Sequence, residues 1–252
     1  MSIFDNLTDI DTVSEQSDSA PASSGAQYGP FPTDAYHMTI DMAYLDVSAG
    51  GAHNVNFVFK DAEGRIVRQT IYFTNRQGQG TYLDKKSGEA RPLPGFTIAN
   101  NLCLLASGDP LAVVGKEAEE KVLSLWDRTA RKELPQKKHV LVDLLGKEII
   151  LGLQEVVDDK NVKNAQGEYV PSGETITINE INAVFRAVDR MSPKEIVGKA
   201  KEATALDNWI TRNQGKQRIK SKIAKGGATP APKAEPTNVA TIAPKSSGSL
   251  FK

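Results

Sequence analysis

Alternating apolar and polar positions predict three consecutive β-strands early in the chain. The first covers residues 37–47, and its apolar face is expected to carry Met38, Ile40, Met42 and Tyr44. A Gly50-Gly51 turn separates it from the second strand, residues 54–60, whose apolar face is expected to carry Val55, Phe57 and Phe59. The sequence DAEG at residues 61–64 is typical of a hairpin turn. It leads to a third strand over residues 66–73.

The third strand has two contrasting faces, and its outward face leads into a basic loop. The core face is expected to carry Val67, Ile71 and Phe73, and the outward face Arg68, Thr70 and Tyr72. The loop, residues 74–95, reads TNRQGQGTYLDKKSGEARPLPG, with four glycines, four cationic side chains and Tyr82. An unpaired nucleic-acid strand requires cations for its phosphates and flat surfaces on which its bases stack. Strand and loop together therefore predict a nucleic-acid-binding surface.

Two simpler interpretations of this region stay open. A solvated hairpin loop also carries lysines and arginines, so a basic turn alone is weak support for nucleic-acid binding. Tyr72 could also be a core residue in a strand that is buried on both faces.

Helical patterns occupy several later segments. Residues 96–107 (FTIANNLCLLAS) predict a helix, and residues 116–132 predict a second, with a buried stripe of Ala118, Val122 and Leu125. Trp126 lies beside that stripe and is expected in the core rather than as a base-stacking platform. Residues 179–188 predict a short helix. A capping box of Ser192 and Glu195, with Pro193 at the first helical position, predicts a helix through Ala205.

The segments between these helices predict strands and loops. Residues 148–157 alternate like a strand in which Gly152 marks a bulge or a close approach of another element. Residues 158–173 are expected to form a polar loop and residues 175–178 a short strand. Residues 140–145 fit either a strand or a short helix. Trp209 is expected to fix the end of the folded body.

Charge is distributed unevenly although the formal net charge is zero. Residues 1–35 contain six acids and no Lys or Arg, and we expect this segment to be disordered. Residues 190–252 contain thirteen Lys and Arg against four acids. The chain thus divides into an acidic N-terminal segment, a folded domain over residues 36–212 and a basic flexible tail over residues 213–252. Such charged ends suggest interaction tails.

The sequence shows no assembled catalytic or metal site. Its three histidines lie far apart, no zinc-ligand spacing includes Cys103, and no phosphate-binding glycine loop or serine nucleophile motif is present. We therefore expect no enzyme activity, no cofactor and no metal. Cys103 lies among leucines and is expected to be a buried thiol. No apolar run is long enough for a membrane span, and no signal peptide is apparent, which favours a cytoplasmic protein.

Five ordered segments carry a family resemblance: TNRQGQGTY, RPLPGFTIANNLCLLASG, LLGKEIILGLQEV, EINAVFRAVDR and ALDNWITRNQGK. Over about residues 35–216 the chain resembles the single-stranded DNA-binding proteins of tailed bacteriophages. The resemblance implies an OB-type barrel with inserted helices ahead of a flexible tail, in the cytoplasm of an infected bacterium. The tail departs from the acidic tail of many such proteins, and the zinc ligands of some members are absent.

The resemblance and the basic surface together predict a protein that coats single-stranded DNA during phage replication and recombination, without strong sequence preference. Bases are expected to stack on Tyr72 and Tyr82, with Phe96 as a weaker candidate. Phosphates are expected to contact Arg68, Arg76, Lys85, Lys86 and Arg91.

Other functions stay open on the sequence alone. The chain could be an adaptor whose charged tails recruit replication, recombination or transcription proteins, or a strand-annealing recombination protein. The tail ends in Leu250, Phe251 and Lys252, which are expected to enter a pocket on such a partner. Alternatively, the tail only adds non-specific affinity for DNA through its lysines.

Overall fold

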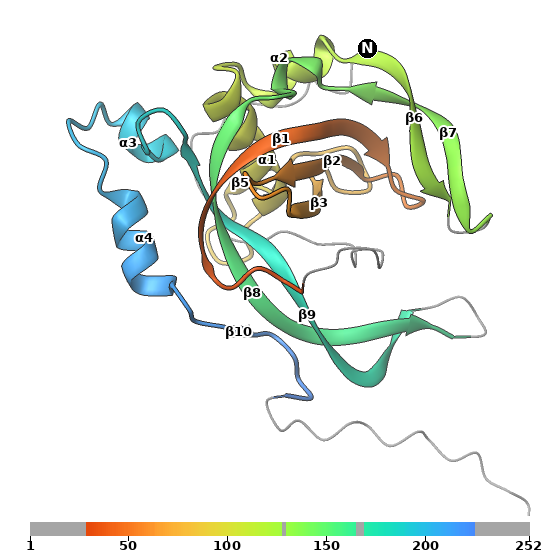
Figure 1. Cartoon of the computed structure of the whole chain (residues 1–252). Helices are drawn as coiled ribbons and strands as arrows, with labels where there is room; N and C mark the ends of the chain where they lie inside the picture. Colours follow the sequence, from red (N-terminus) through yellow and green to blue (C-terminus); the bar gives the residue numbers. More distant parts are fainter. Residues whose placement is uncertain (1–28, 128–129, 165–168, 225–252) are drawn as a thin grey trace, which may run out of the picture.

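The computed structural model describes residues 29–127, 130–164 and 169–224, which form a mainly β structure with few helices (Figure 1). This confirms the expected fold class of a mixed, mainly β domain with inserted helices. The strands are β1 (Asp34–Val47), β2 (His53–Lys60), β3 (Ile66–Tyr72), β4 (Thr81–Leu83), β5 (Ala90–Pro92), β6 (Glu119–Asp127), β7 (Lys132–Val140), β8 (Glu148–Lys163), β9 (Tyr169–Arg186) and β10 (Arg218–Ile219). The helices are α1 (Pro94–Ala106), α2 (Leu111–Lys116), α3 (Pro193–Val197) and α4 (Ala205–Asn213), with a 3₁₀ turn, η1 (Val142–Leu144).

Strand β1 organises the main sheet, whose path runs β10-β8-β1-β2-β3. One edge of β1 pairs with β2 from Thr39 to Val47, while the other pairs first with β8 and then with β7. β9 extends the sheet beyond β8, and β6 beyond β7. Within the described ranges β3 pairs with β2 alone, so the sheet does not close. The OB-type barrel that the resemblance implied is therefore not confirmed.

The core lies between the inner face of β1–β3, helix α1 and the curved β8–β9 pair. The predicted inward residues of β2 and β3 are all buried: Val55, Phe57, Phe59, Val67, Ile71 and Phe73. Helix α1 confirms the helix predicted from residue 96, and it buries Leu102 and the thiol of Cys103. Burial raises the pKa of that thiol, which keeps it protonated and unreactive.

A bulge in β1 reverses the predicted orientation of the side chains in the second half of that strand. The pairing with β2 shifts between Ile40 and Met42, so Asp41 is an extra residue on the β1 side. Met38 and Ile40 are buried as expected, but beyond the bulge it is Ala43 that is buried at 0% exposure. Met42 and Tyr44 were predicted to share the core face and instead project from the opposite one.

The predicted helix over residues 116–132 is wrong, because this segment contains strand β6, which pairs with β7 in an antiparallel ribbon. Successive residues of β6 face opposite sides, so no helical stripe forms. Val122 is 63% exposed and Trp126 is 54% exposed, whereas both were expected in or beside the core. Leu125 is partly buried on the other face.

Two other predictions are wrong, because the segments concerned form the long β8–β9 hairpin. Residues 158–163 and 169–173 belong to its strands rather than to a polar loop, and residues 179–186 are strand rather than helix. The register shifts between Gly152 and Leu153, where Ala183 and Ile181 are successive partners on β9. Asn182 is thus an extra residue, and it places Ile181 and Val184 at a helix-like spacing of three. The bulge that the sequence predicted at Gly152 is thus present, with its extra residue on the partner strand β9.

The C-terminal helices pack on β8 and β9. Ser192 and Glu195 form the predicted capping box, but α3 ends at Val197, and α4 begins separately at Ala205. The Trp209 ring lies so close to Gly152 that an added Cβ would be 2.9 Å from its carbons Cε2 and Cζ2. Trp209 also donates a 2.7 Å hydrogen bond from Nε1 to Asn182 Oδ1.

The ordered domain continues beyond the predicted boundary at residue 212. β10 pairs in parallel with β8, and Ser221 is buried. Lys220 forms an ion pair with Glu180, at 2.6 Å between Nζ and Oε1. The first part of the expected flexible tail is therefore held against β8. The remainder of the tail, with Leu250, Phe251 and Lys252, lies outside the described residues, as does most of the acidic N-terminal segment.

Candidate nucleic-acid interface

The face of β1–β3 that points away from the core carries aromatic, polar and cationic side chains in register. Directly paired residues project to the same face of an antiparallel sheet. One cross-strand row consists of Tyr44, Asn56 and Thr70. The rows on either side of it are Met42, Val58 and Arg68, and Asp46, Asn54 and Tyr72. We call this surface the outer sheet face.

A hydrogen-bond network fixes the polar centre of the outer sheet face. Asn56 donates from Nδ2 to Asn54 Oδ1 at 2.8 Å, and Thr70 donates from Oγ1 to Asn56 Oδ1 at 2.6 Å. The two tyrosines lie on either side of these amides, on the outer strands of the three. Because the amides bond one another, the centre of the face is rigid and its aromatic groups are held at fixed positions.

Charged groups flank Tyr44 on this face. Partial burial raises the pKa of its hydroxyl, the Asp46 carboxylate raises it further, and Arg68 acts in the opposite direction. Arg68 itself is exposed and forms no ion pair in the described part of the chain. A cation next to a tyrosine ring can contact the phosphate that follows a stacked base.

The β6–β7 ribbon reaches the outer sheet face through Lys138. β7 pairs with β1 where Tyr44 lies opposite Val140, and Lys138 forms an ion pair with Asp46 at 2.8 Å between Nζ and Oδ2. The ribbon and the distal part of β8–β9 both extend to the same side of the molecule in Figure 1, with β1–β3 between them. One face of the ribbon, with Leu125, Leu134 and Gln136 partly buried, therefore continues the surface beyond Lys138.

Arg76 lies at the end of β1–β3 where Tyr72 and Asp46 are found. Its Nε atom would be 3.3 Å from a Cβ added at Gly50, so its side chain lies over the β1–β2 turn. The start of the loop is held there because Thr74 Oγ1 accepts a 2.9 Å hydrogen bond from His53 N. The structure thus brings together three of the predicted site residues: Arg68, Tyr72 and Arg76.

The other loop candidates lie on a separate two-stranded sheet formed by β4 and β5. Tyr82 is 43% exposed, and Lys85 and Lys86 are exposed in the turn between the strands. Arg91 is less available to phosphate, because its Nε is 3.1 Å from Asp84 Oδ2 and its Nη2 is 4.0 Å from Glu89 Oε2.

Phe96 was predicted as a weaker stacking residue, and its position contradicts that role. Its side chain is only 3% exposed and belongs to the core face of α1. Residue 96 follows Gly95, whose backbone packs so tightly on the Tyr72 carbonyl that an added Cβ would be 2.0 Å from the oxygen. Helix α1 therefore begins against β3 and directs Phe96 inward.

Sequence reasoning missed two residues of this region: Tyr44 on the outer sheet face, and Lys138 on the neighbouring β7. Tyr44 was assigned to the core because nothing in the alternation marks the bulge at Asp41. Lys138 was placed in no site because its partner, Asp46, is distant in sequence. The exposed Asp41 in the middle of an apolar strand was the one available signal of an irregularity.

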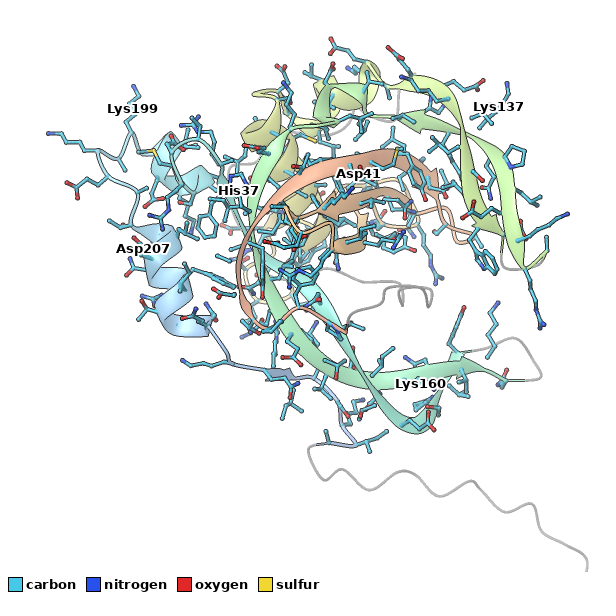
Figure 2. All side chains as sticks on the ribbon, in the orientation of Figure 1. His37, Asp41, Lys137, Lys160, Lys199 and Asp207 are labelled. Carbon is cyan, nitrogen blue, oxygen red and sulfur yellow. The ribbon has the colours of Figure 1, made fainter. Side chains whose placement is uncertain are left out.

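Trp126 is exposed, but it lies on a different surface. It shares the outer face of the β6–β7 ribbon with Val122 and Lys137, since alternate residues face the same side. Figure 2 shows Lys137 on the outer side of the ribbon. Glu133 is paired opposite Trp126, and Lys137 is neutralised by Glu120 at 2.7 Å between Nζ and Oε1. The charge next to Trp126 is therefore unfavourable for phosphate, and Trp126 lies outside the candidate interface.

Comparisons with known proteins found no match: no protein-family model matches the chain, and no curated protein matches it significantly. In the described part of the chain, no three His, Cys, Asp or Glu side chains gather where they could hold a metal ion. None of the helices described is both long and apolar enough to cross a membrane.

Proposed function

We propose that this protein binds single-stranded DNA along the outer sheet face, without strong sequence preference. The observation that carries the proposal is the pair of partly exposed tyrosines, Tyr44 and Tyr72, held on the outer sheet face together with the exposed Arg68. Each base that stacks on an aromatic side chain contributes about 1–3 kcal/mol whatever its identity. Arg68 and Arg76 supply cations at opposite ends of the outer sheet face. The protein acts as a binder rather than an enzyme.

The shape of the surface supports a single strand over a duplex. A nearly continuous sheet face offers aromatic rings to bases that are already unpaired, whereas base edges in a duplex are read from within a groove by a helix or ribbon. Coating of exposed strands during phage replication and recombination is the role that fits such binding and the family resemblance.

The test is a titration of labelled oligo-dT by fluorescence anisotropy, with a duplex of equal length at the same salt concentration. We expect much tighter binding to the single strand. Tyr72→Ala should weaken binding at least about fivefold, because one stacking contact is lost, and should leave the salt dependence unchanged. Trp126→Ala is the matched control, an exposed aromatic outside the interface, and should change affinity less than about twofold.

Two results would contradict the proposal. Equal affinity for single strand and duplex would remove the preference and favour the adaptor function. A larger loss from Trp126→Ala than from Tyr72→Ala would place the binding surface on the ribbon instead of the sheet.

A further inference from the structure

We infer that Asp46 limits the affinity of the outer sheet face for a nucleic-acid strand by holding Lys138 away from phosphate. This inference rests on the proposed function and concerns the same surface. An acid in the row that contains Tyr72 is otherwise unexpected at a site for a polyanion.

The geometry ties Asp46 to its position through both carboxylate oxygens. Oδ2 forms an ion pair with Lys138 Nζ at 2.8 Å, and Oδ1 accepts a 2.8 Å hydrogen bond from Val47 N. The Lys138 side chain is only 16% exposed, and that of Asp46 is 38% exposed. A partly desolvated pair of this kind is screened less by salt than an exposed pair. The ammonium of Lys138 is therefore committed to Asp46 in the free protein.

The location of the pair makes it relevant to a bound strand. Asp46 lies two residues from Tyr44 along β1 and in the same cross-strand row as Tyr72. A strand whose bases stack on both tyrosines must carry its phosphates past this carboxylate. Asp46 then acts against binding twice, because it repels phosphate and it occupies a cation that phosphate could use.

A limit on DNA affinity, as set by Asp46, is useful in a protein that coats DNA. A strand that is covered during replication must be given up to the next protein, so contacts that are individually weak favour release. The Asp46–Lys138 pair lowers the number of phosphate contacts by one and leaves the stacking contacts intact. The protein therefore gives up affinity at one defined position.

The experiment measures oligo-dT affinity over a range of salt concentrations for Asp46→Asn, Lys138→Gln and the double variant. Asp46→Asn should bind roughly three- to tenfold tighter at low salt, and its slope of log affinity against log salt should be steeper by about 0.7, the value of one phosphate contact on a single strand. The double variant should return to the wild-type slope, because the released cation is gone. Lys138→Gln alone should bind more weakly than wild type, since it leaves the acid unpaired.

Asp41→Asn is the matched control. Asp41 is an exposed acid on the same strand, and among the described residues it makes no ion pair. Its removal changes the net charge equally but releases no cation, so the slope should stay at the wild-type value. Thermal unfolding of each variant checks that the fold is intact.

The outcomes are distinguishable from failure of the proposed function. Unchanged or weaker binding by Asp46→Asn, while the wild type binds oligo-dT, overturns the inference alone. So does a steeper slope that persists in the double variant, because Lys138 would then not be its source. Absence of binding by the wild type and all variants refutes the proposed function and the inference with it.

Discussion

Glu195 joins α3 to α4 through one carboxylate, and its replacement should destabilise the C-terminal part of the domain. Oε2 accepts from Ser192 N at 2.8 Å, which completes the capping box of α3. Oε1 accepts from Thr204 N at 2.7 Å and from Ala205 N at 2.8 Å, at the start of α4. Glu195→Ala removes both sets of hydrogen bonds, whereas Glu195→Gln keeps a single oxygen acceptor and so retains at most one set.

The size of the effect follows from the two caps. Loss of a capping side chain costs about 0.5–2 kcal/mol. Because Glu195 is partly exposed, we take values below the sum of two full caps and expect about 2 kcal/mol for Glu195→Ala and about 1 kcal/mol for Glu195→Gln. For a domain of this size, the larger value lowers the melting temperature by roughly 4–8 °C.

The carboxylate also makes this stability depend on pH. Partial burial works to raise the pKa of Glu195, but the hydrogen bonds from Ser192, Thr204 and Ala205 outweigh it and lower the pKa to about 2. The unfolded chain binds a proton at the ordinary value, so the contribution is fully present above about pH 4.5 and is lost as the pH falls toward 2. The stability gap between wild type and Glu195→Gln should therefore narrow from pH 7 to pH 3.

Urea unfolding at pH 7 and pH 3, followed by circular dichroism, measures both effects. Glu202→Gln is the control, because Glu202 is an exposed acid between the same two helices. It should change the free energy of unfolding by less than about 0.5 kcal/mol. A gap between wild type and Glu195→Gln that stays constant from pH 7 to pH 3 would refute the role assigned to the ionised carboxylate.

Three further changes test other parts of the molecule. Gly152→Ala should destabilise the domain by about 1–3 kcal/mol in urea unfolding, since its Cβ would overlap the Trp209 ring; a neutral result would mean that α4 can move aside. Lys85→Ala with Lys86→Ala should flatten the salt dependence of oligo-dT binding by about 1.4 if both contact phosphate, and an unchanged slope would leave the β4–β5 turn as a solvated hairpin. On the proposed phage function, deletion of residues 249–252 should leave oligo-dT affinity unchanged and reduce phage replication in infected cells; intact replication would rule out a partner-binding role for Leu250 and Phe251.

The sequence predicted well wherever side chains alternate without interruption. β2 and β3 follow a strict period of two, and every residue assigned to their core faces is buried. The predictions failed at register shifts. The extra residue Asp41 reversed the facing of Tyr44, and the extra residue Asn182 gave β9 the spacing of a helix. One inserted residue changes the period locally, and only pairing with a neighbouring strand reveals it.

The candidate site was predictable only in part, for a related reason. Arg68, Tyr72 and Arg76 follow one another along a single strand and loop, so their common surface can be inferred from local sequence. Lys138 belongs to the same surface through β7, and its approach depends on the pairing of β7 with β1. The partner strand of β7 in the ribbon, β6, lies within residues 116–132, which were expected to form a helix, so no sequence pattern indicated the ribbon that carries Lys138.

Because of the bulge at Asp41, the side chains that reach the outer sheet face depend on the number of residues in β1. In the half of β1 before Asp41 the even-numbered residues face the core, and in the half after it the odd-numbered residues do. The single extra residue causes this change of facing. Deletion of Asp41 would restore strict alternation and turn the second half over, with Tyr44 directed into the core and Ala43 into solvent. The interface therefore depends on the count of residues in β1 as much as on their identity. In this strand, a shortening by one residue would do more damage than most substitutions.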